Sequence, residues 1–212
     1  MDTTDLRNTL RDEVDDAVVP YLVSDALVYT YIDDAQKMFC RQTEGIEDGR
    51  RFQLAVVANT EWYAIDKSIL KLRKATDTAT GRPVDLINPE KAEGLGVRFD
   101  GRTGVVRALV IGIEKNFARA WPKPSAAMTV ALDVFRLPLT VNLGDELEID
   151  EQHHLSLLLW VKHKFYGNED SEVSNPNKAA EYEQRFRAYC AAARIEQGRA
   201  RRTTSSVSYG GI

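Results

Sequence analysis

The chain is poor in the residues that most often carry catalysis or bind metal ions. Its 212 residues include only two cysteines and three histidines, and neither a Cys-x-x-Cys nor a Gly-x-Ser-x-Gly motif occurs. Zinc sites and dithiol redox centres need paired cysteines. The α/β-hydrolases carry their nucleophile in the second motif. This scarcity disfavours the common zinc, redox and serine-hydrolase sites.

The three histidines, His153, His154 and His163, fall within one predicted helix. At about 100° per residue, His154 and His163 lie on opposite faces, and about 15 Å of helix separates His153 from His163. Three closely spaced acids, Glu146, Glu148 and Glu151, are interpreted as solvated carboxylates. We therefore expect no catalytic residue, no cofactor and no bound metal.

Long apolar runs and a dominant basic charge are also missing. No run approaches the roughly 20 residues that a membrane span needs, and the polar start, MDTTDLRNTL, is not typical of a signal peptide. A net charge of -4 excludes a generally basic chain that coats nucleic acid. Cys40 and Cys190 fall on predicted apolar stripes, and we expect both to be buried, unbridged thiols.

Two helices are predicted before residue 45. The first covers residues 3–18, with Thr3 or Thr4 as its cap, and Pro20 stops it. The second begins with Ser24 as its cap and ends near Gly45. The polar face of the first helix carries four acids, interpreted either as a solvated face or as a surface toward a basic partner or a channel: Asp12, Glu13, Asp15 and Asp16.

A second pair of helices is predicted between Asp150 and Gly198. The first has an apolar stripe at three- and four-residue spacing, and Gly167 is expected to end it in a left-handed conformation. The second begins at Asn175-Pro176, a cap residue followed by proline at the first helical position. Two amphipathic helices with a short link pack antiparallel. The first stripe comprises Leu155, Leu158, Leu159, Lys162, Phe165 and Tyr166.

The region between the helix pairs is predicted to form strands. The runs 52–57 and 61–65, joined by Asn59-Thr60, predict a β-hairpin. The strongest strand signals are 105–113 and 128–137. They flank Trp121–Pro124, where two prolines exclude a helix.

This order of elements predicts an α+β fold. We expect a four-helix bundle from residues 1–45 and 145–198, with an inserted antiparallel β domain at 46–144. Residues 199–212 have three arginines, no acid and little to bury, so we expect a flexible, extended C-terminal arm.

Several motifs occur together along the chain. They are Pro20–Asp25 (PYLVSD), Tyr31–Gln36 (YIDDAQ), Val134–Pro138 (VFRLP), Leu147–Asp150 (LEID), Gln152–His154 (QHH), Tyr166–Asp170 (YGNED) and a last helix with Phe186. In this combination the chain resembles the head-to-tail adaptor, or connector, proteins of tailed bacteriophages, especially short-tailed ones. The likeness covers nearly the whole chain.

The resemblance implies a structural protein without enzymatic activity, located at the head–tail junction of the virion and in the host cytoplasm during assembly. Its members form a ring, typically of twelve copies, between the portal protein and the tail or nozzle protein. The ring extends the DNA channel and encloses DNA without reading its sequence.

Two sets of residues are candidates for this role. The arm is expected to dock on the portal through Arg199, Arg201, Arg202, Tyr209 and Ile212. The channel is expected to be lined by Asp12, Glu13, Asp15, Asp16, Asp145, Glu146 and Glu148, whose charge would repel phosphate. Two alternatives stay open: a nucleic-acid-binding regulator that uses the basic tail, and a small hydrolase with an unrecognised site.

Overall fold

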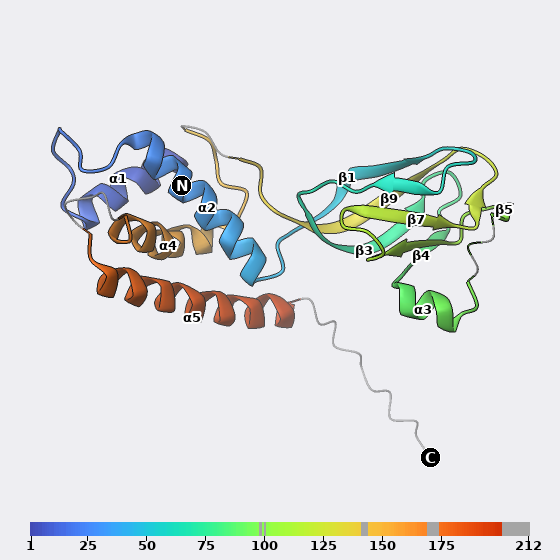
Figure 1. The fold of residues 1–212 in the computed structure, drawn as a ribbon. Helices are drawn as coiled ribbons and strands as arrows, with labels where there is room; N and C mark the ends of the chain where they lie inside the picture. The colour runs from blue at the N-terminus through green and yellow to red at the C-terminus, as the bar shows by residue number, and fades with distance from the viewer. Residues whose placement is uncertain (98, 100, 141–143, 169–173, 201–212) are drawn as a thin grey trace, which may run out of the picture. The chain divides into compact units, whose positions relative to one another are not determined.

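The computed structural model describes residues 1–97, 99, 101–140, 144–168 and 174–200. The chain divides into two compact units, whose elements are labelled along the ribbon in Figure 1. We call Met1–Glu44 with Leu139–Ile212 the helical unit, and Gly45–Pro138 the β unit.

The described residues of the helical unit form four α-helices and one 3-10 turn. They are α1 (Thr3–Glu13), α2 (Asp25–Gln42), η1 (Glu151–His153), α4 (His154–Tyr166) and α5 (Pro176–Ala200). Asp2 and Asp5 form a capping box at the start of α1. The predicted caps Ser24 and Asn175 are confirmed, because each side chain accepts a backbone N–H of its helix, from Leu27 at 3.4 Å and from Lys178 at 3.1 Å.

Helix α4 is the centre of this unit, and α1, α2 and α5 all pack against it. Its buried side chains cover a wide face of the helix rather than a narrow stripe: Leu157, Leu158, Trp160, Val161 and Phe165. A helix that is apolar on most of its circumference belongs inside a helical core. Helix α1 contributes Leu6 and Leu10 to that core, α2 contributes Ile32 and Phe39, and α5 contributes Phe186.

The prediction of a four-helix bundle with an inserted antiparallel domain is wrong. The described residues form a mixed fold, which combines a curled seven-stranded sheet with five α-helices, four of them of substantial length. In a bundle each helix has one narrow inward stripe, whereas the buried face of α4 is wide. Leu155, assigned to its stripe, is 58% exposed. The first helix also ends at Glu13 rather than at residue 18.

Helix α4 ends at Gly167 as predicted, but the predicted left-handed conformation of this glycine is wrong. Its φ is -85°, so it is not in the left-handed region. The close approach of the His163 carbonyl, 2.9 Å from an added Cβ, explains the glycine instead.

The β unit contains a seven-stranded sheet in the order β1-β9-β3-β4-β6-β7-β2 and a separate pair, β5-β8. Its strands are β1 (Ile46–Val56), β2 (Trp62–Ala64), β3 (Ile69–Asp77), β4 (Pro83–Ile87), β5 (Thr103–Gly104), β6 (Ala108–Ile111), β7 (Phe117–Trp121), β8 (Lys123–Pro124) and β9 (Met128–Arg136). Strand β9 lies between β1 and β3, and alternate residues such as Val130, Leu132 and Val134 enter the core.

This sheet is not purely antiparallel, because β4 and β6 run parallel. Parallel neighbours need a crossover, and α3 (Pro89–Gly94), capped by the Asn88 side chain at 2.8 Å, forms part of it. Ala92 of α3 joins Ile87, Ala108 and Val110 in a second apolar cluster.

The hairpin predicted for 52–57 and 61–65 is also wrong. β1 pairs with β9, and β2 pairs with β7, so the two runs have different partners. The chain does turn between them, with Asn59 at φ 62°. The Tyr63 hydroxyl holds this turn by donating to the Thr60 carbonyl at 2.7 Å.

Candidate functional site

The first set of acids that are candidates for a channel surface lies at the C-terminal end of α1 and directly after it. Asp12, Glu13 and Asp15 are exposed, whereas Asp16 is buried. Glu13 forms an ion pair with Lys162 of α4 at 2.6 Å. The exposed acidic surface at this end of the helix is therefore Asp12, Glu13 and Asp15.

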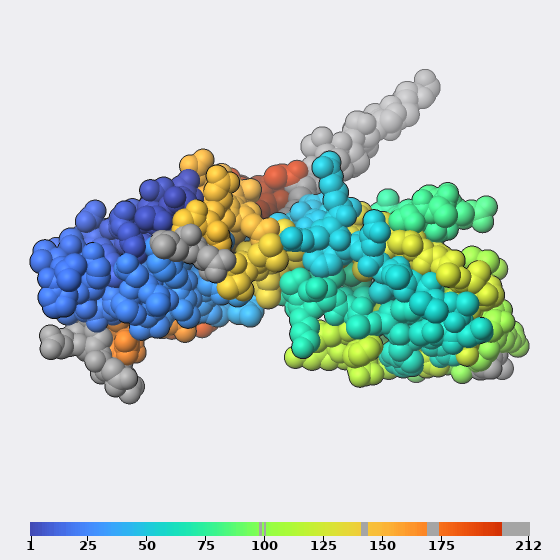
Figure 2. All heavy atoms as spheres, turned by 90° about the horizontal axis from the view of Figure 1, so that it is seen from above, coloured from blue at the N-terminus to red at the C-terminus, as the bar shows by residue number. Residues whose placement is uncertain are grey.

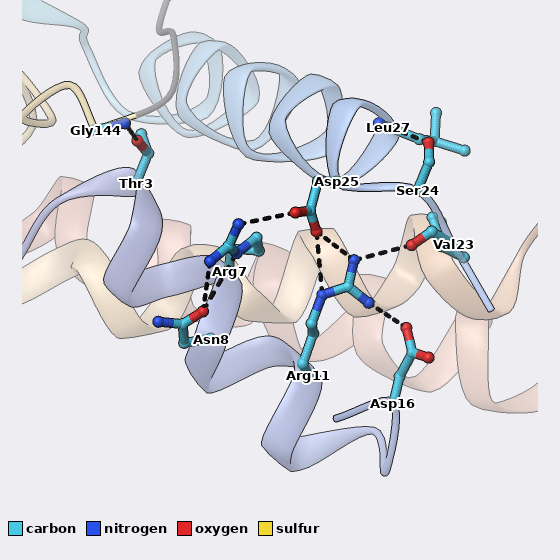
Figure 3. A network of polar contacts seen from close by, with 10 residues as sticks. All are labelled: Thr3, Arg7, Asn8, Arg11, Asp16, Val23, Ser24, Asp25, Leu27 and Gly144. Atoms are coloured by element: carbon cyan, nitrogen blue, oxygen red, sulfur yellow. Dashed lines mark hydrogen bonds and ion pairs between the residues drawn. The ribbon is translucent and has the colours of Figure 1, made fainter. Parts of the chain in front are cut away.

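Asp16 instead belongs to an ion-pair network around Arg11, drawn in Figure 3. The buried Arg11 guanidinium donates to Asp16, to Asp25 at 2.5 Å and to the Val23 carbonyl at 2.9 Å. Arg7 reaches the other oxygen of Asp25 at 2.8 Å. The hydrogen bond from Arg11, assisted by Arg7 and opposed by burial, holds the pKa of Asp25 below its usual value.

This network fixes the loop between α1 and α2. The Leu22 N–H donates to Asp16 at 2.8 Å, and the Arg11 guanidinium stacks 3.6 Å from the centre of the Tyr21 ring. Both ends of the loop are thus tied to one buried arginine. The side chains between them, Ala17 to Leu22, are exposed.

The second predicted acidic segment, Asp145 to Glu151, runs beside α1 (Figure 2). The Thr3 N–H donates to the Asp145 carbonyl at 3.1 Å, and Asp2 and Glu146 form an antiparallel bridge. Glu148 accepts the Leu139 N–H at 2.7 Å. Leu147 and Ile149 are buried, so the acids alternate outward along an anchored strand-like segment.

The structure describes one of the five residues assigned to the arm. Arg199 is exposed in the last turn of α5, and it borders an open hollow with Glu44, Arg194 and Ile195. Arg201, Arg202, Tyr209 and Ile212 lie outside the described residues.

The three histidines connect parts of the helical unit. His153 Nδ1 lies 2.8 Å from the Tyr189 hydroxyl of α5, His154 donates through Nε2 to the Ile149 carbonyl at 2.7 Å, and His163 donates through Nδ1 to the Ala179 carbonyl at 3.0 Å. Within the described part of the chain, no three His, Cys, Asp or Glu side chains are grouped to hold a metal ion.

Both cysteines are buried and neither forms a disulfide, which confirms that prediction. Burial raises the pKa of the Cys190 thiol to about 12. Such a thiol is not ionised near neutral pH and is chemically inert.

Sequence reasoning missed a surface on the β unit. The Arg119 guanidinium lies 3.9 Å from the centre of the Phe99 ring and 5.3 Å from that of Trp62, and its Nη2 pairs with Glu61 at 2.6 Å. Trp62 faces Arg119 across the β2–β7 pair, while Phe99 comes from a loop. Three separate segments build this surface, so no local pattern in the sequence indicates it.

The sequence as a whole matches one family. The model of the SU10 adaptor protein family matches residues 1–209, and the chain belongs to this family. It is thus a structural head–tail adaptor of a bacteriophage. No curated protein matches the chain. Among the described residues, no helix is both long and apolar enough to cross a membrane.

Proposed function

We propose that copies of this chain form a ring between the portal of the phage head and the tail, and that the ring extends the channel through which the DNA passes. The observation that carries this proposal is the family match over residues 1–209. We take the ring to have twelve copies, as the resemblance implied. Copies around a closed ring meet through two different surfaces of each chain.

The exposed acids are the part of the chain that we assign to the channel. Asp12, Glu13 and Asp15 would repel DNA phosphate and so keep the DNA from being gripped as it passes. Asp145, Glu146 and Glu148, on the segment beside α1, belong to the same proposal. Asp16 does not, because Arg11 neutralises it inside the fold.

The arm is the part that we assign to the portal. Arg199, Arg201 and Arg202 can each form two hydrogen bonds with a carboxylate, and Tyr209 and Ile212 can fill apolar pockets. A segment with this composition becomes ordered by binding a partner.

Truncation tests the arm without damaging the helix before it. A chain that ends at Ala200 keeps all of α5, including Arg199, and removes the other four residues assigned to the arm. We expect it to have the melting temperature of the full chain but to be absent from DNA-filled, portal-containing heads after sedimentation. Equal recovery of truncated and full-length protein on those heads, with equal retention of DNA, would remove the arm from the proposal.

A full-length control distinguishes the effect of the arginine charge from that of the planar guanidinium geometry. Arg201→Lys with Arg202→Lys keeps the charge but loses the planar fork of the guanidinium. Weaker attachment of this variant would point to paired contacts with carboxylates, and unchanged attachment would point to charge alone.

A further inference from the structure

The loop between α1 and α2 presents an unusually apolar surface, which we call the apolar loop (Ala17–Leu22). Val18 is 80% exposed and Val19 is 71% exposed, with Tyr21 and Leu22 at 40% and 42%. Figure 1 shows this blue loop extending past the end of α1. Adjacent apolar side chains exposed in this way are typical of a surface that meets a partner.

This loop is held in place rather than free to fold onto its own unit. Arg11 binds Asp16 and the Val23 carbonyl (Figure 3). Asp16 also accepts the Leu22 N–H, and the Arg11 guanidinium stacks on the face of Tyr21. Burying an ion pair costs desolvation free energy, which its partners must offset. The result is an apolar surface whose shape exists before any partner binds, and such preorganisation lowers the entropic cost of association.

The β unit carries a surface of matching character, which we call the aromatic surface (Trp62, Phe99, Phe117 and Arg119). The three aromatic rings are 37%, 40% and 36% exposed. Phe117 precedes Arg119 by two residues in β7, so both lie on one face of the sheet. Tryptophan and arginine are the residues most enriched at the energetic centres of protein interfaces.

The two units also differ in charge. The helical unit contains 13 lysines and arginines against 21 aspartates and glutamates, a net charge of -8, and the β unit contains 15 against 11, a net charge of +4. The same contrast holds locally. Asp12 and Asp15 precede the apolar loop, while Arg102 and Lys123 line a hollow with Phe99 in which Glu61 is already paired with Arg119. Lys115 precedes Phe117 by two residues.

We propose that the apolar loop of one copy docks on the aromatic surface of the neighbouring copy. This inference rests on the proposed ring, for which it supplies the two unlike surfaces that each copy must have. Val18 and Val19 would pack on Trp62 and Phe117. Asp12 and Asp15, which the proposed function assigns to the channel, would in addition face the lysines beside the aromatic rings of the neighbouring copy, which adds specificity and speeds the encounter.

Charge reversal on each surface tests the pairing. The loop variant is Asp12→Lys with Asp15→Asn, since asparagine tolerates the φ of 57° at position 15. The surface variant is Lys115→Glu with Lys123→Glu. Each variant alone sets like charges against each other at every contact, and we expect about tenfold less adaptor on DNA-filled, portal-containing heads than for the wild-type chain.

Mixing the two purified variants gives the decisive result. In a ring where they alternate, every altered loop meets an altered surface and every native loop meets a native surface. We therefore expect the mixture, and a chain carrying all four changes, to recover wild-type occupancy. Val19→Ser should also weaken attachment, whereas Leu95→Ser, on a residue 64% exposed in the β unit, should not.

Each other outcome has a distinct meaning. Melting curves first establish that every variant is folded. If the wild-type chain forms rings on the heads and both charge variants do so equally well, the two surfaces are not the contact. If both fail and the mixture does not recover, the surfaces meet the portal or the tail rather than each other, and the proposal is wrong. If the wild-type chain itself forms no ring, the proposed function fails instead.

Discussion

Arg11 is the residue on which the shape of the α1–α2 loop depends. Its replacement by methionine would leave Asp16 as a buried carboxylate without its partner. Removing one member of a buried ion pair typically costs about 3–5 kcal/mol. We expect Arg11→Met to lower the free energy of unfolding, measured in urea, by about that amount.

The matched control removes both charges. Arg11→Met with Asp16→Asn leaves neither charge of this pair, and the introduced amide oxygen can still accept the Leu22 N–H. The double variant should therefore be more stable than Arg11→Met alone, with an interaction free energy of about 1–3 kcal/mol in the double-mutant cycle. Additive effects would mean that the two side chains do not stabilise each other.

His153 makes stability depend on pH near neutrality. Burial lowers the pKa of His153 from its ordinary value of 6.5, and the neighbouring His154 lowers it further. The charges of Asp150 and Glu196 raise the pKa but offset this shift only in part. In this pH range the unfolded chain binds more protons than the folded one, so stability is fully present above about pH 6.5 and is lost as pH falls toward the folded pKa.

Urea unfolding at pH 7.5 and at pH 5.5 measures this loss. We expect His153→Phe, whose ring can still stack on Phe39, to lose less stability on acidification than the wild-type chain. If His153→Phe and the wild-type chain lose the same free energy of unfolding between pH 7.5 and pH 5.5, the pH dependence belongs to other groups.

At the scale of elements, Phe186 couples α5 to the core. It is fully buried, and its ring centre lies 5.2 Å from that of Trp160 in α4. Truncation of a buried phenylalanine to alanine typically costs about 3–5 kcal/mol. We expect Phe186→Ala to lower the midpoint of thermal unfolding accordingly, while Leu155→Ala, at an exposed position, changes it little. Equal effects of the two variants would contradict this assignment of the core.

The elements that sequence predicts well are those decided by local chemistry. Ser24 and Asn175 begin helices because their side chains accept a backbone N–H within the same turn. The strand at 128–137 is visible from its apolar residues, and β9 occupies residues 128–136. None of these assignments depends on a distant partner.

The predictions that failed depend on distant partners. Whether β1 pairs with β2 or with β9 is decided by residues more than 70 positions away. The burial of Asp16 requires Arg11 to meet a loop that closes through Val23 and Asp25. An acid on a polar helix face and an acid inside a network have the same local sequence pattern, so the four acids Asp12, Glu13, Asp15 and Asp16 could not be separated in advance.

At the scale of the whole molecule, the β unit is one continuous insertion, Gly45–Pro138, whose ends meet. Ile46 at its start pairs with Arg136 near its end, and the Arg136 guanidinium binds Asp48 at 2.8 Å. Facing residues on antiparallel strands lie only about 5 Å apart. The helical unit, in contrast, needs both flanking parts of the chain, because α4 is packed against α1 and α2.

This arrangement predicts that the two units fold independently. An excised fragment Gly45–Pro138 has its own apolar cluster, and we expect it to unfold cooperatively in urea. A chain in which a short Gly-Ser linker replaces those residues should keep the helical circular dichroism of the helical unit, because the linker has only a short gap to span. The fragment Met1–Glu44 serves as the negative control, since Leu6, Leu10, Ile32 and Phe39 would lose the apolar surface of α4. Loss of cooperative unfolding in the excised β unit would show that its fold depends on the rest of the chain.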